Sequence, residues 1–368
     1  MKYRYWGALR FFLALLVVLH HFRVIGGPTI NSAIGFFLPG TVAVMVFFAL
    51  SGFIILEAIY SVYSDRPGRF IANRAIRILA PYYPLLIGSI ALLSTYLFLS
   101  GAPNIEGHVN NVLGWNDLSA ENIGSNAFYL WVNGGFPFFH EFRSELLVPF
   151  WTVRIEFAFY LVCFAGLCIA KYLMPKSSRP AAIDRVCLAA VIATAFICSY
   201  LLIDARPQTW DALYPGIVTF FPLGAAAFLA AERMQAIKFA IPILLVLSVI
   251  GFHGSVWSVP WPNFTAQCVL LIGLLAAAYF TRNLEFPAFK AWDVWLGSLS
   301  YSLYLTHIIV QIIFKNFIGN GPVVFLAGVI VSLGFAILYQ AMTQPLIDRV
   351  RDAVRGSPIN RSPKAATA

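Results

Sequence analysis

The sequence predicts an all-α fold: a polytopic integral membrane helical bundle of about ten transmembrane helices, with both termini cytoplasmic. Of its 368 residues, 60% are hydrophobic and only 11% are charged, and the mean hydropathy is +0.78. Soluble domains carry about 25% charged residues. Long apolar runs follow one another along the whole chain, and basic residues gather in short clusters between them. Because these clusters do not form one interleaved basic patch, we expect no nucleic-acid partner.

Ten apolar runs are close to the roughly 20 residues that cross a bilayer as a helix. In order, they cover residues 7–25, 36–58, 78–100, 146–170, 183–203, 212–231, 238–252, 264–281, 294–314 and 322–346. The first run follows two basic residues, as a signal peptide would, but the sequence RVIGGP after it offers no small-x-small cleavage site. We therefore expect the first run to be retained as a span.

Lysine and arginine are unequally distributed between the two sides of these spans. If the N-terminus is cytoplasmic, 20 of the 25 lie on the cytoplasmic side, four lie outside, and Arg154 lies within a span. Cytoplasmic loops of membrane proteins carry this excess of positive charge, and an odd number of spans would remove the asymmetry. The distribution therefore favours ten spans.

The domain organisation expected from this pattern is simple. Residues 1–348 form one membrane-embedded domain, and residues 349–368 form a basic, disordered cytoplasmic tail, because the end of the tail has too few apolar residues to bury. The five cysteines all lie in apolar runs without ligand-like spacing, so we expect no metal site.

Ionisable side chains within the apolar runs are the first candidate functional residues. Charge at membrane depth is costly, and such groups face a bundle interior or a wet cavity. At 100° per residue, Arg10 and His21 differ by only about 20° around the first helix and lie roughly 16 Å apart along its axis, whereas His20 points about 80° away. The structural alternative is an arginine that reaches the interface and a hydrogen-bonded core histidine.

Two further runs carry polar groups at a comparable depth. In PFWTVRIEFAFYL (149–161), Arg154 and Glu156 lie inside the fourth run, where an internal ion pair is the structural alternative. In LGSLSYSLYLTHIIV (296–310), one polar stripe at i, i+4 and i+7 is made by Ser300, Tyr304 and His307. Such stripes also serve hydrogen bonding between helices. The groups that we expect to meet in one layer are His21, Arg154, Glu156 and His307.

An arginine pair precedes the third span. RFIANRAIRILAPYYP (69–84) places Arg74 and Arg77 at i, i+3 on one helix face. The cytoplasmic excess of positive charge alone would explain two arginines. Two guanidinium groups on one face also suit a phosphate, because each can bind an anion through two hydrogen bonds.

Five segments together resemble acyltransferase family 3, the bacterial integral membrane O-acyltransferases that modify cell-surface and secreted glycans. They are ALRFFLALLVVLHH (8–21), VFFALSGF (46–53), NRAIRILAPYY (73–83), FWTVRIEFAFYL (150–161) and SLSYSLYLTH (298–307). The segments stand in family order and cover most of the chain. The resemblance implies transfer of an acyl group, usually acetyl, from cytoplasmic acyl-CoA to a sugar hydroxyl, by a multi-pass protein of the bacterial cytoplasmic (inner) membrane.

The resemblance also implies roles for individual residues. His21 matches the essential first-span histidine, and Arg10, Arg74 and Arg77 match positions associated with the acyl donor. Motif positions whose roles are less settled are matched by Trp151, Glu156, Tyr160, Ser300, Tyr301, Tyr304 and His307. Of these we expect Glu156 and His307 to be catalytic, and the others, with Arg154, to serve acceptor binding or structural support. The sequence departs from the family pattern at Met45, where an aspartate is usual, and at Thr343, where a glutamate is usual.

The expected mechanism follows from general acid–base chemistry. A sugar hydroxyl is a weak nucleophile, so we expect neutral His21 to accept its proton as the thioester is attacked, with Glu156 fixing the tautomer. The alternative mechanism is acylation of His21 itself, followed by transfer. The three arginines would bind the phosphates of CoA, so acyl-CoA is a donor substrate and no tightly bound cofactor is expected.

Two other functions compete with this interpretation. A multipass transporter or flippase for a glycolipid or polysaccharide would line its substrate path with the same charges, but it predicts internal repeats that the sequence does not show by eye. A structural subunit of a polysaccharide assembly complex would use the polar groups only for packing. The sequence leaves open which glycan accepts the acyl group (an exopolysaccharide, an O-antigen or a lipid-linked glycan), the acyl length and the oligomeric state.

Overall fold

The computed structural model describes residues 6–106, 112–127, 146–147, 150–173, 184, 189, 218–255, 261–284 and 287–355. In this part of the chain the protein is almost wholly helical, which confirms the predicted all-α class. The two strands β1 (Asn104–Glu106) and β2 (Val112–Gly114) pair antiparallel in a small hairpin.

The helices follow the apolar runs of the sequence. They are α1 (Gly7–Phe22), α2 (Pro28–Phe37), α3 (Pro39–Ala58), α4 (Pro67–Ser100), α5 (Ala120–Ala127), α7 (Phe150–Leu173), α10 (Phe220–Glu232), α11 (Ala240–Ser255), α12 (Trp261–Thr281), α13 (Lys290–Phe317) and α14 (Pro322–Arg355). Seven stretches among the described residues are long and apolar enough to cross a membrane, and two shorter apolar stretches, Phe220–Glu232 and Gln235–Ile250, lie between them. The protein is therefore a multi-pass membrane protein by length and composition, and the total of ten spans stays a prediction.

Helix is present among the described residues of every expected span; of 183–203 only residues 184 and 189 are described, and both are helical. The helices extend beyond the apolar runs where the flanking residues are polar. α4 begins eleven residues before the expected span, at Pro67, and α14 continues to Arg355, into the segment expected to be the tail. The second expected span is preceded by a separate helix, α2, because Leu38 adopts a left-handed conformation (φ 41°) and Pro39 begins α3.

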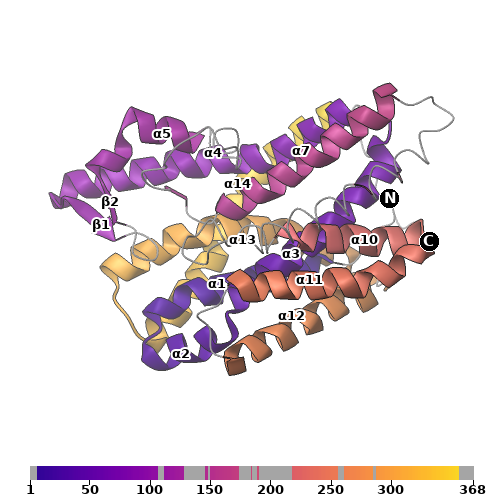
Figure 1. The fold of residues 1–368 in the computed structure, drawn as a ribbon. Coiled ribbons are helices and arrows are strands. Elements are labelled where there is room, and N and C mark those ends of the chain that lie inside the picture. Colours follow the sequence, from indigo (N-terminus) through magenta and orange to yellow (C-terminus); the bar gives the residue numbers. More distant parts are fainter. Residues whose placement is uncertain are drawn as a thin grey trace, which may run out of the picture.

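The helices pack as a bundle around α1, α3 and α13 (Figure 1). α1 lies between α3 and α13, and α13 also packs on α14. α4 and α7 lie on one side of these helices, and α10, α11 and α12 lie on the other. The beginning of α1 and the end of α14 lie at the same end of the bundle, because Trp6 and Arg351 line one cavity there.

Small residues bring two helices into backbone contact. A Cβ on Gly224 of α10 would lie 1.8 Å from the carbonyl oxygen of Ala49 in α3, and a Cβ on Gly52 would lie 2.2 Å from the carbonyl oxygen of Phe221. A side chain at either position would force the backbones apart, so α3 and α10 are in close backbone contact. Small residues at helix contacts are typical of membrane bundles.

Candidate functional site

A wide cavity opens where α1 begins. Its volume is about 300 Å³, and its lining comes from α1, α3, α4, α13 and α14. The charged side chains in its lining are Arg10, Glu57, Arg77, Asp293 and Arg351. The Asp293 carboxylate accepts hydrogen bonds from the backbone N–H groups of Gly7 (3.0 Å) and Ala8 (2.8 Å), and so it caps the first turn of α1. This cap holds Arg10, one turn further along, against the cavity.

A second cavity, the inner chamber, lies deeper in the bundle. Its volume is about 60 Å³, and its polar lining is formed by Arg10, Ser51, Arg77, Thr152, Glu156, Ser300, Tyr301 and Tyr304. Arg10, Arg77 and Tyr301 line both cavities, so the chamber and the wide cavity meet at these three side chains. The two cavities are therefore neighbours that share part of their walls.

Glu156 is held within the chamber wall by two hydroxyl groups. Ser51 donates to its carboxylate at 2.9 Å, and Tyr160 donates to the same oxygen, Oε1. Arg10 and Arg74 both interact electrostatically with Glu156 and with Arg77. Three guanidinium groups and one carboxylate thus interact in this region, and the excess positive charge suits an anionic ligand.

The arginine pair of α4 is divided between two surroundings. Arg77 is half-buried and lines both cavities. Arg74 is buried, and its guanidinium carbon lies 5.8 Å from the ring centroid of Phe70 and 5.7 Å from that of Tyr160. Arg74 is among the lining residues of neither cavity. The i, i+3 spacing therefore directs Arg77 at the cavities and packs Arg74 among aromatic rings.

His21 and His307 form a stacked, hydrogen-bonded pair. His21 Nδ1 lies 2.7 Å from His307 Nε2, and the two rings are 7° from parallel with centroids 5.0 Å apart. His307 is fully buried, and its Nδ1 donates to the carbonyl oxygen of Leu303 at 3.1 Å. A neutral His307 ring with its hydrogen on Nδ1 must accept at Nε2. His21 then donates from Nδ1, so its own Nε2 carries the lone pair.

Tyr304 connects the histidine pair to the inner chamber. It lines the chamber, shares a hydrogen bond with the Thr152 hydroxyl, and lies with its ring centroid 6.0 Å from that of His307. The predicted stripe on α13 thus reaches from the chamber to His21. Ser300, at the start of the stripe, donates to the Gly297 carbonyl oxygen at 2.8 Å.

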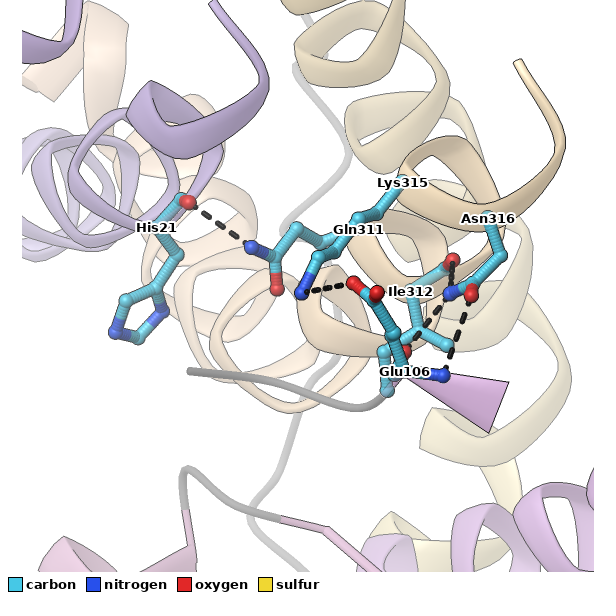
Figure 2. Close-up of polar contacts among 6 residues, drawn as sticks. All are labelled: His21, Glu106, Gln311, Ile312, Lys315 and Asn316. Carbon is cyan, nitrogen blue, oxygen red and sulfur yellow. Dashed lines mark hydrogen bonds and ion pairs between the residues drawn. The ribbon is translucent and has the colours of Figure 1, made fainter. Parts of the chain in front are cut away.

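The β1–β2 hairpin is attached through Glu106 to the end of α13 that follows His307. Figure 2 shows the contacts of Glu106 with Lys315 and Asn316. Asn316 donates to the Glu106 carbonyl oxygen at 2.8 Å and accepts from the Glu106 N–H at 3.3 Å, and Lys315 pairs with the Glu106 carboxylate at 3.0 Å. Gln311, one turn before Lys315, donates to the backbone carbonyl oxygen of His21 at 3.0 Å. These contacts place the hairpin at the end of the bundle where α1 ends, opposite the wide cavity.

The structure brings most of the residues predicted from the sequence into this one region. Those that line the chamber or hydrogen-bond one another are Arg10, His21, Arg77, Glu156, Tyr160, Ser300, Tyr301, Tyr304 and His307. Trp151 and Arg154 belong to α7, but their side chains lie outside the described part. Sequence reasoning did not single out Ser51, Thr152 or Gln311, because a lone Ser, Thr or Gln within an apolar run carries no pattern.

The chain matches the acyltransferase domain family over residues 3–341. Among curated proteins, it is 28% identical over 336 residues to the exopolysaccharide production protein ExoZ of Rhizobium meliloti (strain 1021), an alignment that covers 86% of this chain and 92% of that protein. It is 23% identical over 323 residues to an O-acetyl transferase of Shigella phage Sf6, with 82% and 84% covered. No solved structure matches the chain.

Proposed function

The chain belongs to acyltransferase family 3, and from that premise we propose that it is an O-acyltransferase that moves an acetyl group from cytoplasmic acetyl-CoA to a sugar hydroxyl. The observation that carries this proposal is the pair of cavities joined at Arg10, Arg77 and Tyr301. Together they reach from one end of the bundle to Tyr304, beside the histidine pair. A long anionic donor with a reactive end group suits such a path.

The arginines bind the donor in this proposal. Arg77 and Arg10 face the path, and guanidinium groups bind phosphate oxygens through paired hydrogen bonds. The phosphates of CoA would lie in the wide cavity, and the pantetheine arm would carry the thioester past Tyr301. Arg74 helps to position Glu156 indirectly, because it packs on the ring of Tyr160 and Tyr160 donates a hydrogen bond to Glu156.

His21 is the general base. Its Nε2 accepts the proton of the sugar hydroxyl while the hydroxyl oxygen forms a bond to the thioester carbonyl carbon. The tetrahedral intermediate then collapses, the carbon–sulfur bond breaks, and the imidazolium of His21 returns the proton to the departing thiolate. The products are the sugar ester and free CoA.

His307 orients the base. Its bond to the Leu303 carbonyl oxygen fixes its own tautomer, and its Nε2 then fixes the hydrogen of His21 on Nδ1. We therefore assign to His307 the orienting role that the sequence suggested for Glu156. Glu156 instead offsets part of the positive charge of the three arginines.

The proposed topology places the wide cavity at the cytoplasmic face of the bacterial inner membrane, with ten spans and both termini cytoplasmic. The excess of lysine and arginine on that side supports this orientation. The β1–β2 hairpin would then lie on the outer side with the acceptor. The similarity to ExoZ, an exopolysaccharide production protein, supports an exopolysaccharide as the acceptor class.

The proposal is tested with purified protein in nanodiscs. Binding of acetyl-CoA is measured by calorimetry and release of free CoA by chromatography, for wild type, His21→Ala and Arg77→Ala. Arg233→Ala, which removes a half-exposed arginine paired with Asp184 outside the site, is the control. We expect His21→Ala to bind without releasing CoA. Arg77→Ala should bind about tenfold or more weakly, because hydrogen bonds to charged groups contribute about 1.5–3 kcal/mol.

The control variant should match wild type in both measurements. Folded wild-type protein that binds no acetyl-CoA at millimolar concentration would overturn the proposal. Equal CoA release by wild type and His21→Ala would remove the role of His21.

A further inference from the structure

The apolar wall of the inner chamber is part of the site that the proposed chemistry leaves without a role. This wall consists of Val44, Phe47 and Phe48 from α3, Ile78 from α4 and Val153 from α7. It lines the same chamber as the charged and hydroxyl groups and as Tyr304. A polar site for phosphates alone would not need it.

The chamber begins at the wide cavity and ends at Val44. Along α3, Ile54 and Glu57 line the wide cavity, Ser51 lines the chamber, and Val44 lies a further seven residues along the helix. Seven residues of helix span about 10 Å. A donor that enters from the wide cavity therefore presents its last atoms to the apolar wall.

The size of the chamber limits what those atoms can be. An apolar protein cavity of about 150 Å³ holds benzene, which has six carbon atoms, or roughly 25 Å³ for each. The chamber, at about 60 Å³, holds two or three non-hydrogen atoms on this scale. An acetyl group has three and a butyryl group has five. We propose that the inner chamber is the acyl-binding pocket, and that Val44, Phe48 and Val153 restrict the donor to acetyl-CoA.

Close packing behind Phe48 opposes a displacement of this part of the wall. The ring of Phe48 stacks on Phe221 with centroids 4.5 Å apart, and Phe221 stacks on Phe159 at the same distance. Phe48 is 3% exposed and Phe221 is fully buried. The glycine contacts between α3 and α10 hold the two helices that carry this stack in backbone contact. Close-packed interiors of this kind resist even one added methylene.

Three substitutions test the pocket. Val44→Ala and Val153→Ala each remove two methyl groups from the wall and so enlarge the chamber, whereas Val44→Leu fills it. Val46→Ala is the matched control, because Val46 is fully buried on the same helix and lines neither cavity. His21-dependent release of CoA is measured with acetyl-CoA, propionyl-CoA and butyryl-CoA for each variant, after its melting temperature has been recorded.

For wild type we expect kcat/KM to fall about tenfold or more for each added methylene, the usual effect of one methylene in an apolar pocket. Val44→Ala and Val153→Ala should raise kcat/KM for propionyl-CoA by about tenfold. Val46→Ala should leave the ratio of kcat/KM for propionyl-CoA to kcat/KM for acetyl-CoA unchanged. Val44→Leu should lower the activity with acetyl-CoA at an unchanged melting temperature.

The inference rests on the proposed function, and the experiment separates the two. If wild type uses acetyl-CoA and butyryl-CoA equally in a His21-dependent way, the acyl pocket is wrong and the acyltransferase proposal stands. The pocket is also wrong if Val46→Ala changes the donor ratio as much as Val44→Ala does. If no donor yields His21-dependent release of CoA, both proposals fail.

Discussion

His21 and His307, 286 residues apart in the sequence, lie with parallel rings and share a hydrogen bond of 2.7 Å between Nδ1 of His21 and Nε2 of His307. The bond from His307 to the carbonyl oxygen of Leu303 sets the direction of this pair, because a carbonyl oxygen only accepts. This series of hydrogen bonds, from Leu303 through His307 to His21, therefore leaves the lone pair of His21 on its Nε2 atom. The fold thus selects the tautomer that the proposed role of His21 as general base requires.

The first prediction concerns this chain of hydrogen bonds. His307→Ala should lower the rate of CoA release by about 100-fold, within the range that a positioned base contributes, and leave acetyl-CoA binding unchanged. His307→Gln should recover part of the loss, because an amide oxygen can still accept from His21 Nδ1. The measurement is kcat and Kd for acetyl-CoA in nanodiscs. A purely structural His307 would instead lower binding, rate and melting temperature together in both variants.

The second prediction separates the two arginines of α4. Arg77→Ala should raise KM for acetyl-CoA by about tenfold or more and change the melting temperature little, because Arg77 faces both cavities. Arg74→Ala should mainly lower the melting temperature, because Arg74 is buried between Phe70 and Tyr160 and such stacking contributes about 2 kcal/mol when desolvated. The same effect of both substitutions on KM would contradict this division.

The sequence predicts the helices of this fold better than it predicts their ends. Apolar runs locate the spans because a bilayer demands about 20 apolar residues. They do not reveal that α14 continues to Arg355, since the polar turns beyond an apolar run are equally able to be helical. The break at Leu38 was also missed, because the run from 36 to 58 is apolar on both sides of it.

The candidate site likewise has features that the sequence predicts and features that it does not. Helical periodicity placed Arg10 and His21 on one face and joined Ser300, Tyr304 and His307 in one stripe, since both follow from the geometry of a single helix. Contacts between helices have no such signature. The bond from Ser51 to Glu156 and the stack of Phe48 on Phe221 depend on which helices are neighbours, and that is seen only in the folded bundle.

The third prediction tests the backbone contact between α3 and α10. Gly224→Ala should lower the melting temperature, because its Cβ would lie 1.8 Å from the Ala49 carbonyl oxygen and forced overpacking costs about 1–3 kcal/mol. Gly273→Ala, on α12, is the matched control, because nothing lies within 4 Å of its Cβ. Alanine favours a helix over glycine by about 1 kcal/mol, so the control should be unchanged or more stable. Equal melting temperatures for the two variants would contradict the tight contact.

The fourth prediction concerns the attachment of the β1–β2 hairpin to α13. Asn316→Ala removes two hydrogen bonds to the backbone of Glu106, and each contributes about 1 kcal/mol. Amide hydrogen exchange in residues 104–106 should therefore become at least about tenfold faster. Lys315→Ala should have a much smaller effect, because the Glu106 carboxylate is mostly exposed to solvent and ion pairs at such sites contribute about 0–1 kcal/mol.

Mass spectrometry of exchanged peptides measures the exchange rates, and release of CoA is followed in parallel. Because the hairpin is attached beyond His307, away from both cavities, donor turnover should not change in either variant. Slower turnover in Asn316→Ala would show that the hairpin also holds His21 in place, through Gln311 on the same helix.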